Sequence, residues 1–149
     1  MRHLIRIMEP KVNIALEAAR AGCKELLSFA YRLDQLEVKE KGPSNYVTQL
    51  DKRVESIIID SLKSIYPKHT YVSEEVGRIE GSGKDIESMW VIDPLDGTTN
   101  YIHGFPYYAI SIAYIEKGKT LHALVIDVAR QDLSLIHISE PTRPERIAD

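Results

Sequence analysis

The chain has 149 residues, of which 44% are hydrophobic and 28% charged, and its formal net charge is −3. This composition is typical of a globular domain with a sizeable core, and the small negative charge gives no electrostatic indication of binding to nucleic acid or anionic membranes. No apolar run approaches the roughly 20 residues of a membrane span, and the single cysteine, Cys23, excludes an internal disulfide framework. We therefore expect a cytoplasmic protein without a signal peptide.

The first part of the chain predicts two amphipathic helices. Apolar residues recur every three or four positions from Lys11 to about Leu33. The polar stretch from Glu37 to Ser44 then predicts a loop or a short hairpin. A second helix is expected from Thr48 to Tyr66, and Pro67 ends it.

After Pro67 the hydrophobic period changes to that of strands. Strands are expected at Thr70–Ser73, Met89–Ile92, Tyr108–Ile115 and Thr120–Val128. Residues 77–88 are polar and contain glycine, which predicts a surface loop. Two helices followed by several strands predict an α+β fold, in which a helix layer packs on a mostly antiparallel sheet.

Residues 90–101 have the sequence WVIDPLDGTTNY, in which a short apolar strand ends in two acids, Asp93 and Asp96. Pro94 fixes one backbone dihedral and Asp96-Gly97 permits a tight turn, so both carboxylates can face the same point beyond the strand. Two anions this close repel each other unless one is protonated or a cation lies between them. Their hard oxygens suit Mg²⁺, which fills its remaining positions with water and substrate phosphate. The segment therefore predicts a magnesium site.

Gly97, Thr98 and Thr99 follow the two acids directly. If a helix begins here, its free backbone N–H groups form a cradle for a phosphate group, beside the metal site. The structural alternative is that Asp-Pro-x-Asp-Gly is only a turn with capping residues. The apolar strand before the acids and the Gly-Thr-Thr after them favour the functional interpretation.

Two further acidic positions allow both a structural and a functional interpretation. Glu74-Glu75 ends an expected strand, either as a solvated acidic pair or as the source of a further metal ligand. Asp51 completes the pattern Thr48-x-x-Asp51, which is a capping box. The two roles of Asp51 are compatible, because a capping acid at a helix start is well fixed in space.

Residues 90–101 resemble, almost letter for letter, the signature of the inositol monophosphatase family of Mg²⁺-dependent, lithium-sensitive phosphatases. Three more segments agree with that family in order and spacing: KGPSNYVTQLD at 41–51, YPKHTYVSEEVG at 66–77 and FPYYAISIAYIEKGK at 105–119. The match is greatest to bacterial inositol-1-monophosphatases. It implies the first half of a layered sugar-phosphatase fold, which in complete form is a homodimer that uses two or three Mg²⁺ ions.

The resemblance implies a metal role for four matching residues. Glu74, Asp93 and the Leu95 carbonyl would hold the first Mg²⁺. Asp93 and Asp96 would bind the second. The chemistry implied is metal-assisted hydrolysis, in which no protein side chain becomes phosphorylated.

The resemblance also places substrate and attacking water against the same segment. The expected substrate contacts are Glu74, Leu95, Asp96, Gly97 and Thr98, the last two through their backbone N–H groups. Asp51 and Thr98 would orient the water, with Glu74 taking part. Asp51, Glu74 and Thr98 are therefore the expected catalytic residues.

The resemblance ends near Asp132. Family members continue into a second α/β half, which supplies another Asp for the second metal in a W-D-x-A segment and most contacts to the inositol ring; here the only tryptophan is Trp90. Leu133 to Arg143 resembles the in-frame translation of a transposase-based sequencing adapter. We therefore expect a family domain at 1–132 and a non-biological tail without a sheet strand at 133–149. A genuine short protein is the alternative.

These patterns predict Mg²⁺-dependent hydrolysis of a small polyol or sugar phosphate monoester, with inositol monophosphate favoured, and an inactive fragment in the chain as given. Within enzymes the alternative substrate is a nucleotide 3′-phosphate or a sugar bisphosphate. The alternative from another class is a non-catalytic interaction protein, because bacterial relatives are implicated in transcription antitermination complexes. Four converging acids favour the enzyme, since a pure binding module does not need them.

Overall fold

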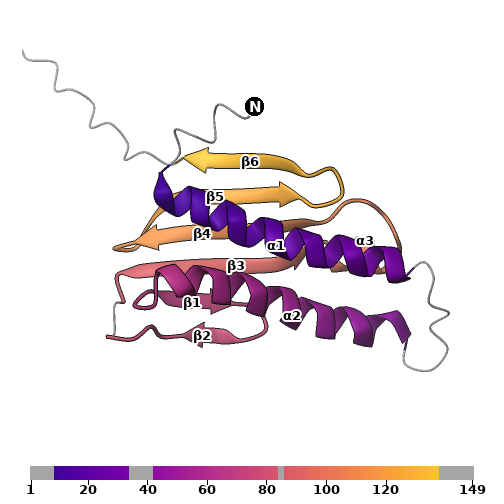
Figure 1. Ribbon diagram of the computed structural model, residues 1–149, viewed down its shortest axis with the longest axis horizontal. Helices are drawn as coiled ribbons and strands as arrows, with labels where there is room; N and C mark the ends of the chain where they lie inside the picture. The colour runs from indigo at the N-terminus through magenta and orange to yellow at the C-terminus, as the bar shows by residue number, and fades with distance from the viewer. Residues whose placement is uncertain (1–8, 34–41, 84–85, 138–149) are drawn as a thin grey trace, which may run out of the picture.

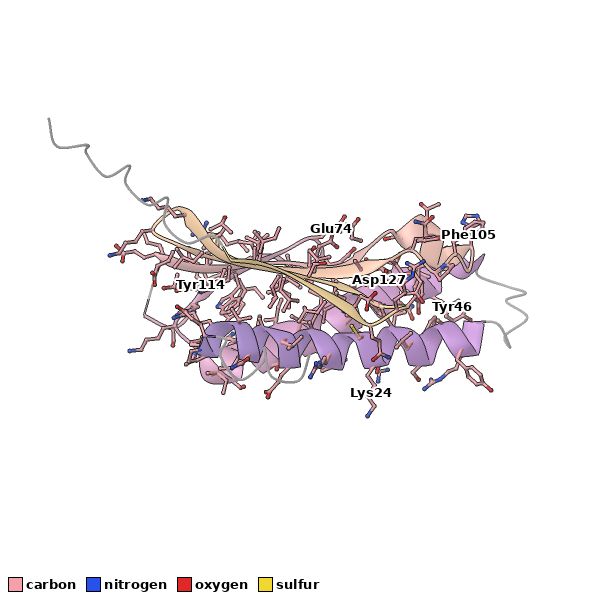
Figure 2. The ribbon with its side chains drawn as sticks, turned by 90° about the horizontal axis from the view of Figure 1, so that it is seen from above. Lys24, Tyr46, Glu74, Phe105, Tyr114 and Asp127 are labelled. Atoms are coloured by element: carbon pink, nitrogen blue, oxygen red, sulfur yellow. The ribbon has the colours of Figure 1, made fainter. Side chains whose placement is uncertain are left out.

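The computed structural model describes residues 9–33, 42–83 and 86–137. Two long helices lie side by side over a six-stranded sheet (Figure 1). Seen from above, both helices lie on the same face of the sheet, and the opposite face carries no helix among the described residues (Figure 2). This arrangement confirms the predicted α+β fold with one helix layer. No described helix is both long enough and apolar enough to cross a membrane.

The first helix, α1, comprises Pro10–Leu33. Pro10 occupies its first position, where a missing N–H costs nothing because that group has no partner within the helix. The buried residues of α1 follow the predicted spacing: Val12, Leu16, Ala19, Cys23 and Leu26. They pack the helix against the sheet.

The second helix, α2, comprises Gly42–Ile65 and so begins well before the predicted Thr48. The first turn of a helix tolerates Gly and Pro, because its N–H groups have no partners within the helix. Asp51 therefore lies inside α2 and not at its N-terminus, and the capping-box interpretation of Asp51 is wrong. Residues 37–41 of the predicted loop lie outside the described residues.

The sheet has the strand order β2-β1-β3-β4-β5-β6. The strands are β1 (Thr70–Ser73), β2 (Gly77–Ile79), β3 (Ser88–Asp96), β4 (Ala109–Glu116), β5 (Lys119–Asp127) and β6 (Asp132–His137). Only β1 and β3 pair in parallel, and all the other neighbours are antiparallel. The prediction of a mostly antiparallel sheet is thus confirmed.

Two strands differ from the expected ones near the signature. β2 lies within the region expected to be a loop, because Gly77, with a φ of 74°, turns the chain back onto β1. β3 continues past Ile92 to Asp96 and includes Pro94. Its pairing with β4 shifts register between Asp93 and Asp96, and such an irregularity is where a strand can accept proline.

Large aromatic side chains fill the core between helices and sheet. Trp90, Tyr71 and Tyr114 are each at most 1% exposed. The Trp90 Nε1–H donates to His69 Nδ1 at 3.0 Å, and the His69 ring stacks on Tyr66 with centroids 4.7 Å apart. Burying a side chain of this size contributes about 1.5–3 kcal/mol, so this cluster is a main source of stability.

The strand β6 includes residues that were expected to form no strand. Leu133 to His137 pair with β5 in a regular antiparallel register, in which Leu133 lies opposite Ile126. Leu133 packs against the core, whereas Ser134, Leu135 and Ile136 are exposed, as expected of a strand at the edge of the sheet. The prediction that this part of the tail does not form a strand is therefore wrong. Residues 138–149 lie outside the described part of the chain.

Candidate functional site

Two parallel strands deliver acidic residues to one edge of the sheet. The register of β1 and β3 pairs Ser73 with Ile92, so the next residues, Glu74 and Asp93, start from adjacent positions. Asp51 approaches from α2 and is only 6% exposed. Its charge interacts with those of both Glu74 and Asp93. The fold thus brings together three of the predicted site residues from three separate elements.

The electrostatics of Asp51 are those of a crowded carboxylate. Burial, and then the charges of Glu75, Glu74, Asp93 and Glu55, raise the pKa of Asp51 to about 7. Its Oδ1 atom is buried and has no hydrogen-bond partner within the described residues. We call these five residues the inner acid group. A cation among them would relieve the repulsion and supply a partner for the buried oxygen.

The end of β3 holds Asp93 in a fixed orientation. The backbone N–H of Leu95 donates to Asp93 Oδ1 at 3.2 Å, and the Thr98 hydroxyl donates to the Leu95 carbonyl at 3.2 Å. Burial raises the pKa of Asp93, the Leu95 N–H opposes the shift, and the charge of Asp96 adds to it. Asp96 itself is exposed. The segment from Asp93 to Thr98 is therefore held by hydrogen bonds between its own residues, as an Asp-Pro-x-Asp-Gly turn favours.

Gly97 connects β3 to the short helix α3, which comprises Thr98–Ile102. Its φ of 91° lies in the left-handed region, and a Cβ atom there would approach the Tyr107 carbonyl to 2.7 Å. Only glycine fits this position, because any other residue would combine backbone strain with a backbone clash. The turn that presents the Gly97 and Thr98 N–H groups therefore depends on Gly97.

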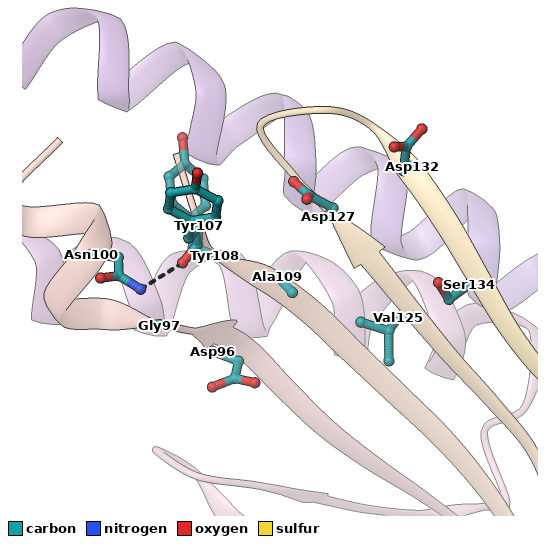
Figure 3. Close-up of a pocket in the computed structure, with 10 residues that line it drawn as sticks. All are labelled: Asp96, Gly97, Asn100, Tyr107, Tyr108, Ala109, Val125, Asp127, Asp132 and Ser134. Atoms are coloured by element: carbon teal, nitrogen blue, oxygen red, sulfur yellow. Dashed lines mark hydrogen bonds between the residues drawn. The ribbon is translucent and has the colours of Figure 1, made fainter. Parts of the chain in front are cut away.

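An open pocket of about 540 Å³ lies beside Gly97 (Figure 3). Asp96 lines one side, and Asp127 and Asp132 line the other, at the turn between β5 and β6. The Asn100 Nδ2 group donates to the Tyr107 carbonyl at 2.9 Å and closes one end. We call Asp96, Asp127 and Asp132 the outer acid group. No role was predicted for Asp127 or Asp132. The only feature of the sequence that could have indicated them is an acid at each end of the β5–β6 turn.

The donor chemistry of the inner acid group fits Mg²⁺, although the group is not a closed metal site. Hard carboxylate oxygens, mutual repulsion and the unpartnered Asp51 Oδ1 are what a divalent cation would satisfy. Within residues 9–33, 42–83 and 86–137, no group of three or more His, Cys, Asp or Glu side chains is already arranged to hold a metal ion. Asp93 thus has Glu74 at the adjacent strand end and interacts with the charge of Asp96, but the three do not form a complete ligand sphere.

Two members of the inner acid group, Glu55 and Glu75, have no role in the sequence analysis. Glu55 is fully buried, and it lies four residues after Asp51 on the same face of α2. The four-residue spacing between Asp51 and Glu55 can be read from the sequence, and in a helix it places both side chains on one face. The charges of both glutamates of the β1–β2 turn, Glu75 and Glu74, raise the pKa of Asp51.

In this fold, two helices cover one face of a mostly antiparallel sheet. The acidic residues of the site lie where the parallel strands β1 and β3 end. The model of the inositol monophosphatase family matches residues 8–136. The chain belongs to the inositol monophosphatase family, as the resemblance implied. The match includes most of β6 and extends past Asp132.

Relatives match this chain over about half of their own length. Nus factor SuhB of Pseudomonas aeruginosa is 48% identical over 125 residues, which are 84% of this chain and 46% of that protein. The crystal structure of the extragenic suppressor protein SuhB from Bartonella henselae has a TM-score of 0.73 and 33% identity, and the match covers 85% of this chain and 48% of that one. For the inositol monophosphatase from Anabaena the TM-score is 0.67 at 30% identity, with 84% and 42% covered.

Proposed function

We propose that this chain is the N-terminal half of a Mg²⁺-dependent phosphoric monoester hydrolase, with inositol monophosphate as the favoured substrate among small polyol and sugar phosphates. The observation that carries the proposal is the inner acid group. Burying Asp51 among four other carboxylates is unfavourable in the absence of a cation, so the arrangement has a cost that a structural role does not explain. Membership of the inositol monophosphatase family supports the same conclusion.

In this proposal Glu74, Asp93 and the Leu95 carbonyl hold one Mg²⁺, and Asp93 and Asp96 contribute to a second. Bound Mg²⁺ lowers the pKa of a ligated water and stabilises charge on the leaving oxygen. Asp93 is suited to a shared role, because the Leu95 N–H occupies only one of its oxygens and leaves the other available.

The chain's own groups orient the reactants. In this proposal Asp51 and Thr98 orient the attacking water. The Thr98 hydroxyl donates to the Leu95 carbonyl at 3.2 Å, so its oxygen can accept a hydrogen bond from that water. The backbone N–H groups of Gly97 and Thr98 hold the substrate phosphate, in a turn that requires glycine. Glu74 takes part in orienting the water. The remaining ligands and the contacts to the sugar ring would come from the second half of the full-length protein.

Assays of the full-length protein test this proposal. With Mg²⁺, we expect phosphate release from inositol monophosphate and none after chelation by EDTA. A panel with a nucleotide 3′-phosphate and a sugar bisphosphate would identify the alternative substrates. Absence of Mg²⁺-dependent release from every member of the panel would contradict the proposal. We further expect the full-length protein to be cytoplasmic and to elute as a homodimer in size-exclusion chromatography.

A second candidate function is a role in transcription antitermination complexes. The relative from Pseudomonas aeruginosa is named a Nus factor, which favours this candidate. The two functions can be separated with a variant that loses hydrolysis, such as Asp93→Asn. If that variant still binds purified transcription elongation complexes as well as the wild type, binding does not depend on the hydrolytic site.

A further inference from the structure

Glu55 is a charged residue that the proposed hydrolysis does not use. It is 0% exposed, in the middle of α2 and one helical turn after Asp51. Like charges four residues apart destabilise a helix, and a buried charge costs more than an apolar side chain of the same size. Glu55 is among none of the ion pairs within the described residues. Burial of Glu55 in the core therefore requires interactions that offset the free-energy cost of removing its carboxylate from water.

The contacts of Glu55 supply that compensation at one turn of the backbone. Its Oε2 accepts the N–H of Glu75 at 3.1 Å, and its Oε1 accepts the N–H of Val76 at 2.8 Å. Both oxygens of one carboxylate thus bind two consecutive N–H groups, and bonds to a charged acceptor are about twice as strong as neutral ones. No uncharged side chain can reproduce this pattern, because Gln and Asn have only one acceptor oxygen.

The turn that Glu55 holds is the one that carries Glu74 and Glu75. It connects β1, which ends at Ser73, to β2, which begins at Gly77 with a φ of 74°. The side chains at 74–76 are exposed, and the two bonds from Glu55 tie the backbone of this turn to α2. Figure 2 shows Glu74 at the surface, above the sheet and away from the helices.

We infer that Glu55 is a positioning residue, which holds the 74–76 turn through two backbone N–H groups and so keeps Glu74 beside Asp93 at the ends of β1 and β3. The inference rests on the proposed function, because it assigns Glu55 to the support of the same metal site. Glu55 touches neither substrate nor metal in this role. It acts only through the backbone that carries Glu74.

The test uses the full-length protein and the variant Glu55→Gln. The new amide presents an NH₂ group to one of the two N–H donors, so one bond is lost and the turn loosens. We expect Mg²⁺ affinity, measured by calorimetry without substrate, to fall by about 10-fold or more, as when other supporting partners of metal ligands are removed. We also expect faster amide hydrogen exchange at Glu75 and Val76, and a fall in kcat with little change in KM.

The matched control is Leu62→Ala, which removes a fully buried side chain from the same helix, away from the turn. It should lower the melting temperature while Mg²⁺ affinity and exchange at Glu75 stay within about twofold of the wild type, since core truncation destabilises without moving a ligand. Glu55→Asp is the second variant, in case Glu55→Gln does not fold. It keeps the charge but withdraws both oxygens by one methylene, and should weaken Mg²⁺ binding in the same direction.

The outcomes separate the two proposals. If the wild type binds Mg²⁺ but hydrolyses no phosphate ester, the proposed function is wrong. The Mg²⁺ affinity and the amide hydrogen exchange of the variants then still decide the role of Glu55. If the folded Glu55 variants bind Mg²⁺ as tightly as the wild type, or no more weakly than Leu62→Ala, the positioning role is wrong. A wild type that does not bind Mg²⁺ would overturn both.

Discussion

The two acid groups differ in how the chain supports them. In the inner group, Asp51 is buried, Glu55 accepts two backbone N–H groups, and Asp93 accepts a third. The outer group lines an open pocket, and there Asp127 pairs with the exposed Arg130 at 2.9 Å. Burial and hydrogen bonds thus hold Asp51, Glu55 and Asp93, whereas Asp96 and Asp132 of the outer group are exposed and Asp127 is half-buried beside Arg130.

This difference indicates which part of a metal site this chain can build alone. Buried carboxylates with fixed orientations repel strongly, and that repulsion favours binding of a cation. Exposed carboxylates repel weakly, because water and salt screen their charges. We therefore expect the inner group, together with Asp96 beside Asp93, to dominate the activity, and Asp127 and Asp132 to contribute little. Four predictions test this comparison.

The largest effect is expected for the 149-residue chain expressed as written, which should be poorly soluble and have no measurable phosphatase activity. On the sheet face opposite α1 and α2, apolar residues such as Val91 and Ile136 are exposed. Within the described residues, β6 has a neighbour, β5, on one side only, and both features favour aggregation. Size-exclusion chromatography and phosphate release, compared with the full-length protein, provide the measurement. A monodisperse, active chain would show that it is a complete short enzyme.

The second prediction concerns Asp93, which in the proposal would contribute to both Mg²⁺ sites. In the full-length protein, Asp93→Asn should abolish phosphatase activity, while the fold survives because removing one crowded anion relieves repulsion. Asp132→Asn in the outer group is the control, and it should keep both turnover and melting temperature. Wild-type turnover of the Asp93 variant at saturating Mg²⁺ would refute the assignment.

The third prediction concerns Asp51, whose place inside α2 excludes a capping role. Asp51→Asn should lower turnover by about 10²-fold or more, since an amide cannot accept a proton from the attacking water. Asp60→Asn changes an exposed acid of the same helix and should leave turnover unchanged. Steady-state kinetics of both variants decide the question, and unchanged turnover of the Asp51 variant would remove this residue from the mechanism.

The fourth prediction is the pH dependence of stability in the metal-free protein. The pKa of Asp51 is raised to about 7 in the folded state, so the folded state binds more protons than the unfolded state between the ordinary value, 3.8, and about 7. Stability therefore falls as the pH rises through this window. At about pH 8, Asp51→Asn should be more stable than the wild type by on the order of 2 kcal/mol, and at about pH 4 the two should be equal.

Urea unfolding in EDTA at the two pH values measures this difference. Added Mg²⁺ should reduce or reverse it at the higher pH, because a cation removes the repulsion that the substitution relieves. A difference that does not change with pH would show that Asp51 is not crowded in the folded protein.

The helices and central strands could be predicted because their signals are local. The apolar residues of α1 lie at the spacing that buries one face, and Tyr108–Ile115 agrees with β4 to within a residue. β2 and β6 could not be predicted, because the short segments 77–79 and 132–137 become strands only by pairing with β1 and β5. Pairing between strands depends on the whole sheet, and no short pattern encodes it.

The sequence alone was enough to identify the family and to predict where a functional site lies. The order and spacing of Asp51, Glu74, Asp93 and Asp96, and the turn at Gly97, were enough to identify the family and to predict a site for a cation and a phosphate. Only the tertiary structure decided how these groups are held. Burial of Asp51, the bonds of Glu55 to the 74–76 turn and the contrast with the open pocket arise between segments far apart in sequence. Desolvation and charge repulsion depend on distances in space, and folding is what sets those distances.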